Sequence, residues 1–240
     1  MAMDAGPLGS FAAGVAEVRT LAALTDGRTD DEAVNALCRS SVVLLVSHFE
    51  AFVGNLAEDF IDVLSTGELF AHQIPVGVRE VHTLPRLQAI IESNDAEQRG
   101  ALLKKLSDVT ALWNPQAKPA PGTLKPATLK REVTNAHAET IDGLFHLMGQ
   151  RGAVCDGDLD YSDDDNGRTK TANIRFSLRD AVKCRNDIAH GDVDRKPTPA
   201  DVSRYLNFLV ALAERLSRKQ DDLVEPYRQL VVSEQGQAAS

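Results

Sequence analysis

Two charged residues in this 240-residue chain fall on the core-facing sides of their expected helices, where an ionised group needs a partner. On a helical wheel Glu50 falls about 80° from Val42, inside the apolar arc of its expected helix. Arg185 falls in the middle of the apolar arc of a second expected helix. Because a guanidinium keeps its charge, a buried Arg185 needs a partner. We predict that Glu50 and Arg185 pair or approach one site; the alternatives are a structural ion pair and an arginine that reaches the helix edge.

His190 lies at the end of the second of these helices and is followed by Gly191. A histidine titrates near neutral pH and can move protons, while Arg185 can neutralise charge on a phosphate during transfer. RNA brings its own nucleophile, the 2′-OH, so this pair could cleave RNA without a metal ion. The alternative is a histidine that only stabilises the helix C-terminus, with Gly191 as the cap.

The geometry of one helix does not bring these two side chains together. Arg185 and His190 differ by about 140° around an ideal helix. Two arrangements remain open: a two-fold dimer that combines the arginine of one subunit with the histidine of the other, or a last turn that unwinds at Gly191.

Positive charge gathers around the same helix. The chain has a net charge of −9, which excludes a nucleic-acid coat protein, and 5% aromatic residues argue against an aromatic platform for single strands. Residues 167–196 nevertheless hold eight basic residues against four acidic ones. This local excess suits a phosphate backbone, and an ordinary solvated face is the alternative. The candidate RNA-binding residues are Arg175, Arg179 and Lys183.

The elements that position these residues are expected to be helices. A capping box at Thr29 and Glu32, and Thr198 followed by Pro199, predict two helix starts, while Pro75 and Pro85 are expected to break a third helix. No useful strand pattern appears, so the predicted class is all-α. Helical spacing predicts helices over 11–24, 30–65, 87–91, 101–112, 128–148, 173–190 and from 198 to about 220 or 232.

The domain organisation follows from the same pattern. Residues 11–225 are expected to form one helical domain with two long loops, 113–126 and 149–170, the second rich in aspartate. Residues 1–10 are expected to be a flexible terminus, and residues 226–240 a C-terminal tail.

Several classes of site and location are not expected. The longest apolar runs fall short of the roughly 20 residues that span a bilayer, and no signal peptide precedes them. The three cysteines have no metal-binding spacing and indicate reduced thiols in a cytoplasmic protein. The acidic run over 156–165 does not fit a calcium loop. We therefore expect no metal, no cofactor and no membrane partner.

Residues 185–191, RNDIAHG, match the R-x4-6-H motif of the HEPN superfamily. The upstream segment SHFEAF, which carries Glu50, also resembles that superfamily, and the chain is most similar to its RiboL-PSP-type branch over roughly residues 11–225. The resemblance implies a HEPN-like α-helical bundle that dimerises and brings two motifs together in a cleft. Many such proteins are metal-independent ribonucleases in toxin–antitoxin or other defence systems.

The resemblance also assigns roles to residues. It implies that Arg185 and His190 are the catalytic pair, that Asn186 is the polar neighbour of the arginine, and that Glu50 is the supporting acid. HEPN toxins with a nucleotidyltransferase antitoxin often carry a tyrosine two residues after the motif histidine. Asp192 stands there, so that particular pairing is not expected.

The function expected from these features is a dimeric, metal-independent endoribonuclease that acts as a toxin or defence effector. Its expected partners are RNA and a second copy of the chain, with an antitoxin protein as a further candidate. A non-catalytic HEPN module that binds nucleotide or RNA, or serves as a dimeric scaffold, is the alternative. A structural helical protein with an accidental motif is a third reading.

Overall fold

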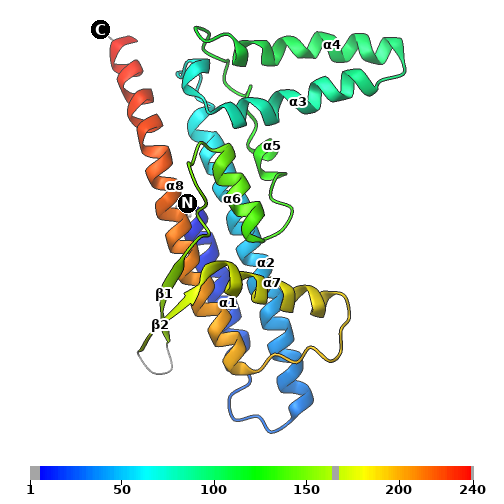
Figure 1. Ribbon diagram of the computed structural model, residues 1–240, viewed down its shortest axis with the longest axis vertical. Coiled ribbons are helices and arrows are strands. Elements are labelled where there is room, and N and C mark those ends of the chain that lie inside the picture. Colours follow the sequence, from blue (N-terminus) through cyan, green and yellow to red (C-terminus); the bar gives the residue numbers. More distant parts are fainter. Residues whose placement is uncertain (1–5, 164–167, 239–240) are drawn as a thin grey trace. The chain divides into compact units, whose positions relative to one another are not determined.

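The computed structural model describes residues 6–163 and 168–238, and long helices dominate this part of the chain (Figure 1). The expectation of an all-α fold is confirmed. The helices are α1 (Gly6–Ala23), α2 (Asp31–Leu64), α3 (Val76–Glu92), α4 (Ala96–Thr110), α5 (Pro126–Lys130), α6 (Ala138–Leu147), α7 (Ile174–Ala189) and α8 (Pro199–Ala238). Two short 3₁₀ turns, η1 (Ala71–Gln73) and η2 (Ala111–Trp113), and one small sheet of β1 (Asp158–Asp163) and β2 (Arg168–Asn173) complete the described elements.

The chain forms two compact units. Unit 1 contains the chain up to Asn55, Val133–Asp142 and Val154–Lys219, and unit 2 contains Leu56–Glu132, Gly143–Ala153 and the chain from Gln220. All of the candidate site residues belong to unit 1. The expectation of a single domain over 11–225 stays a prediction.

The core of unit 1 is built around the apolar face of α2. Phe11 of α1 lies with its ring centroid 5.8 Å from that of Phe49 and 5.4 Å from that of Phe52. Gly14 of α1 faces the ring of His48, so close that a Cβ atom there would lie 2.5 Å from the ring. Burial of these aromatic rings fixes α1 against α2.

The segment 149–170 is not a loop throughout, contrary to the sequence expectation. It contains β1 and the first half of β2, an antiparallel pair with Asp160 opposite Thr171 in register. Leu159 and Tyr161 alternate with exposed or acidic residues, and the Tyr161 ring packs on Phe208 of α8 at 6.2 Å. Two inward-facing side chains are enough to hold a short hairpin whose acidic composition is typical of a loop. Residues 164 and 165 of the acidic run lie outside the described residues, as do residues 166 and 167.

Several expected helix boundaries were wrong. Residues 6–10 form the first turns of α1 rather than a flexible terminus, and α8 continues through the expected tail to Ala238. Pro85 lies inside α3 and Pro226 inside α8, so neither ends its helix. Packing of the buried faces overrides the loss of one backbone hydrogen bond at each proline.

Two of the predicted helix caps can be compared directly with the structure. Thr198 caps α8 as expected, because its hydroxyl accepts the Asp201 N–H. For α2 the cap is Asp30 rather than Thr29, since the Asp30 carboxylate accepts the N–H groups of Glu32 and Ala33. The helix expected over 128–148 is interrupted between α5 and α6.

α2 is also the one described helix that could span a membrane by length and composition alone, with a window of mean hydropathy 1.5. The core helix of a folded protein has the same property, and the apolar face of α2 is fully buried at Val42, Leu45 and Phe49. The expectation of no membrane partner stays a prediction.

In unit 2, a glycine at the start of α3 allows close helix packing. A Cβ atom at Gly77 would lie 2.8 Å from the Leu147 Cα. We expect Gly77→Ala to lower the free energy of unfolding by about 1–3 kcal/mol, because the added Cβ atom would meet the Leu147 backbone, which cannot rotate away.

Gly100 of α4 has no neighbour within 4 Å. Gly100→Ala is the matched control and should raise stability by up to about 1 kcal/mol. Urea unfolding measures both; a neutral Gly77→Ala would contradict the packing.

Candidate functional site

Helix α7 carries the sequence motif and forms as the sequence predicted. Asn173 caps its start, with its side-chain oxygen accepting the Phe176 N–H at 3.1 Å. One face of the helix, with Leu178 and Val182 among its residues, is buried. This anchoring fixes the rotation of the helix, and with it the directions in which Arg185 and His190 point.

Arg185 and Glu50 form an ion pair between α7 and α2, in which Arg185 Nη2 donates to Glu50 Oε1. Their predicted meeting is thereby confirmed. The pair is half-buried rather than sealed in the core, since 20% of the Arg185 side chain and 26% of the Glu50 side chain remain exposed. The guanidinium is therefore fixed in place while part of it still faces solvent.

His190 lies at the C-cap of α7, and the helix ends there in a Schellman motif. The Gly191 N–H donates to the Ile188 carbonyl and the Asp192 N–H donates to the Asp187 carbonyl. Gly191 has φ +85°, the left-handed conformation that this cap requires. The His190 side chain is exposed.

The last turn of α7 does not unwind. The His190 N–H still donates to the Asn186 carbonyl at 2.9 Å, as in a continuous helix. This excludes one of the two arrangements that the sequence left open. Arg185 faces α2 and His190 lies on another side of the same helix, so a shared phosphate would need a second copy of the chain.

The Schellman cap leads to a prediction about Gly191. We expect Gly191→Ala to destabilise the chain by about 1 kcal/mol and to disturb the position of His190, because a Cβ atom disfavours positive φ. Gly122 is a matched control, since it has φ +82° and no neighbour within 4 Å. Both variants should lose similar stability in thermal unfolding, but only Gly191→Ala should impair RNA cleavage or binding. Equal activity of both would show that the cap does not position His190.

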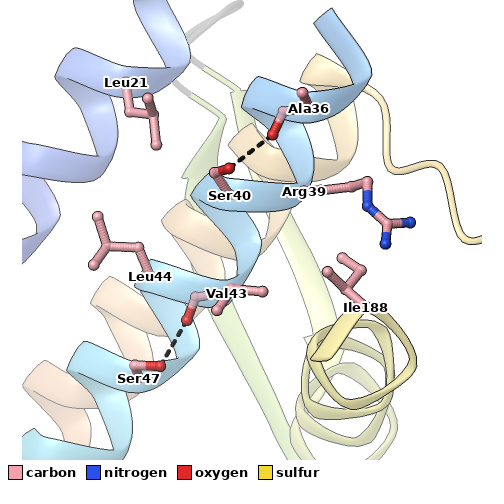
Figure 2. Close-up of a pocket in the computed structure, with 8 residues that line it drawn as sticks. All are labelled: Leu21, Ala36, Arg39, Ser40, Val43, Leu44, Ser47 and Ile188. Carbon is pink, nitrogen blue, oxygen red and sulfur yellow. Dashed lines mark hydrogen bonds between the residues drawn. The ribbon is translucent and has the colours of Figure 1, made fainter. Parts of the chain in front are cut away.

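Arg39 of α2 holds the segment that follows His190, a role that sequence reasoning missed. Its Nη1 donates to the backbone carbonyls of Asp192 at 2.6 Å and Arg195 at 2.7 Å. Figure 2 shows the Arg39 side chain extending from α2 past Ile188 at the end of α7. The sequence contains one signal of this role. Arg39 precedes Glu50 by eleven residues, about three helical turns, so both residues lie on the same face of α2.

Beside Arg39 lies an open groove of about 600 Å³. Leu21 of α1, Ile188 of α7 and a row of α2 side chains line it (Figure 2). The α2 residues are Ala36, Arg39, Ser40, Val43, Leu44 and Ser47. The hydroxyls of Ser40 and Ser47 bond back to the carbonyls of Ala36 and Val43. The groove wall is therefore mostly apolar, apart from Arg39.

We expect Arg39→Ala to release the segment after His190, because two backbone carbonyls lose their donor. RNA cleavage should fall about 10-fold through changed positioning, with the pH profile altered. Arg39→Lys should restore part of the activity, since an ammonium can still reach one carbonyl. Cleavage rates across pH 5–9 measure this. An unchanged rate and pH profile in Arg39→Ala would contradict a positioning role.

The three predicted RNA-binding cations differ in their surroundings. Arg175 is held by carboxylates, with Nε 2.6 Å from Asp156 Oδ1 and a shorter contact to Asp142. The Asp156 hydrogen bond is the main cause that raises the pKa of Arg175. Arg179 and Lys183 are exposed, and Lys183 pairs with Asp187 at 2.7 Å. RNA binding by these residues stays a prediction, and the geometry favours the last two over Arg175.

The other features that the sequence predicted concern Asn186, Asp192 and the lack of metal ligands. Asn186 is half-buried on α7, and its carbonyl bonds to the cap. Asp192, at the position of the modified tyrosine in some HEPN toxins, accepts the Asp194 N–H through its side chain. Within residues 6–163 and 168–238, no group of three or more histidine, cysteine or acidic side chains could hold a metal ion.

Comparison with protein families matches residues 10–225 to the MAE_28990-like HEPN family. The chain belongs to the HEPN superfamily. This confirms the superfamily that the RNDIAHG segment indicated, while the resemblance to the RiboL-PSP-type branch stays a prediction. No match was found among curated proteins or among solved structures. HEPN domains are helical, as this chain is.

Proposed function

We propose that this HEPN protein is a metal-independent endoribonuclease that works as a homodimer in a toxin or defence role. The observation that carries the proposal is the arrangement of the motif: Arg185 is fixed by Glu50, and His190 is exposed at a capped helix end. A cytoplasmic location and a possible antitoxin partner belong to the same proposal.

The chemistry needs only groups that the chain and RNA contain. His190 of one protomer takes the proton of a ribose 2′-OH, and the 2′-oxygen attacks the neighbouring phosphorus. Arg185 neutralises the additional charge on the phosphate as the bond to the 5′-oxygen breaks. The same imidazole then passes the proton it has taken to that leaving oxygen. The products are a 2′,3′-cyclic phosphate and a 5′-OH.

The dimer supplies what one copy lacks. Arg185 and His190 project from α7 about 140° apart, and the capped last turn keeps them so. A two-fold axis beside α7 would place the arginine of each protomer next to the histidine of the other.

The test is incubation of the purified protein with labelled RNA in EDTA, beside a DNA strand of the same sequence. Cleavage of RNA alone, leaving 2′,3′-cyclic phosphate ends, is the expected result. Cleavage of DNA, or RNA products with 3′-OH ends, would contradict 2′-OH attack. Expression in a host cell complements this assay, and growth should recover when His190 is replaced by alanine.

A non-catalytic RNA-binding HEPN module is the second candidate function. Its support is that Arg185 already has a partner in Glu50, as a purely structural arginine would. RNA that stays intact in EDTA but shifts in a gel with the protein would favour this function over the ribonuclease.

A further inference from the structure

The exposed side of α7 carries an aromatic ring that the proposed mechanism does not use. Phe176 is 69% exposed, in the first turns of the helix. A phenylalanine ring that leaves most of its surface in water contributes little to folding. Its backbone is nevertheless held rigidly, because its N–H bonds to the Asn173 cap.

The position of Phe176 relates it to His190. At 100° per residue, Phe176, Arg179, Lys183 and His190 fall within an arc of about 60°. Arg179, Lys183 and His190 are exposed, so the line contains a ring, two cations and a histidine on one surface. Arg185 falls on the opposite side, toward Glu50.

The dimensions of the line suit a nucleic-acid strand. Phe176 and His190 are fourteen residues apart, about 21 Å along the helix axis, and Lys183 lies midway. A strand of a few nucleotides laid along the helix could therefore contact all of these side chains at once.

We propose that Phe176 is a base-stacking residue that fixes the register of the RNA strand along α7. The inference rests on the proposed ribonuclease function and adds a residue that binds its substrate. Stacking needs a base face that is free of its neighbours, which single strands and loops offer and duplexes do not. Arg179 and Lys183 contact the phosphates between the stacked base and the phosphate at His190.

This inference agrees with the low aromatic content of the chain. A multi-residue platform is not needed when one ring fixes the register of the strand and cations hold its backbone. Lys183 is shared with Asp187 at 2.7 Å, so RNA binding at Lys183 replaces a surface ion pair of small value.

The test uses Phe176→Ala, Phe176→Leu and Phe176→Trp, each combined with His190→Ala so that bound RNA stays intact. The probe is a short single-stranded RNA containing 2-aminopurine, whose fluorescence falls when the base stacks. Phe176→Ala should weaken binding about 5- to 100-fold and abolish the fluorescence change. Phe176→Leu should behave like Phe176→Ala, and Phe176→Trp like the phenylalanine. Leu103→Ala, which removes a 52% exposed leucine from α4, is the control for loss of an exposed apolar side chain.

Three outcomes would overturn the inference. The first is wild-type affinity in Phe176→Ala while Lys183→Ala binds RNA less tightly, which leaves the proposed ribonuclease intact. The second is equal binding of the duplex form of the same RNA. The third is a change of oligomeric state in Phe176→Ala by light scattering without RNA, which would make the ring a protein contact. If the wild type does not cleave RNA and the His190→Ala protein does not bind it, the proposed function fails and this inference fails with it.

Discussion

Replacing His190 with alanine should lower metal-free RNA cleavage by about 100- to 10,000-fold while the protein stays folded. The loss is large because the proposed reaction needs a proton acceptor at the 2′-OH and a proton donor at the 5′-oxygen. His190 is exposed and follows the last residue of α7, so its removal leaves no cavity. Thermal unfolding should show a change of at most about 1 kcal/mol, from the lost interaction of the imidazole with the helix C-terminus.

His146 provides the control, since it is an exposed histidine in the last turn of α6. His146→Ala should cleave RNA at the wild-type rate. Equal activity of His190→Ala and wild type would remove His190 from the chemistry.

Mixed dimers test the two-copy arrangement directly. A preparation that combines Arg185→Ala chains with His190→Ala chains contains heterodimers with one site that keeps both an arginine and a histidine. We expect mixing to restore measurable cleavage that neither variant has alone. Failure of mixing, in heterodimers shown to form, would contradict a site shared between protomers.

Replacing Arg185 with alanine should affect stability and activity together. The substitution leaves the half-buried Glu50 carboxylate without its partner, which costs about 1–2 kcal/mol after allowance for the exposure of both side chains. The rate of RNA cleavage should also fall, by about 100- to 1,000-fold, because the variant loses a fixed cation near the negative charge that develops on the phosphate.

A double-mutant cycle separates the two roles of the pair. Urea unfolding of Glu50→Ala, Arg185→Ala and the double variant measures the coupling energy, expected between about 0.5 and 2 kcal/mol. Cleavage by Glu50→Gln should be reduced less than cleavage by Arg185→Ala, since the amide oxygen still accepts a hydrogen bond from the guanidinium. If Arg185→Met with Glu50→Leu regained stability and retained full cleavage, the ion pair would be structural only.

The ion pair could be predicted from the sequence because charged residues are conspicuous on apolar helix faces. Glu50 and Arg185 each interrupt a stretch of core-facing residues, so the wheel singles them out. The same logic placed α7 and its caps, where Asn173 and Gly191 are residue types with a known local function. Local chemistry determines these features, and local chemistry can be read from the chain.

The remaining features depend on contacts that leave little trace in the sequence. Arg39 acts on backbone carbonyls of residues about 155 positions away, and carbonyls are the same at every residue. The β1–β2 hairpin relies on Tyr161 packing against Phe208, a contact with a distant helix. Pro85 was expected to break α3 because propensity was weighed without the packing that overrides it.

Helix α2 positions both ends of the RNDIAHG motif through two of its side chains. Glu50 contacts Arg185, and Arg39 contacts the segment after His190, from positions eleven residues apart that point within about 20° of each other. Substitutions on the outer face between these two residues are therefore tolerable, but the number of residues between them is not free to vary. A single inserted or deleted residue would swing one contact about 100° away from the other. The length of this stretch should thus vary less among related chains than its composition does.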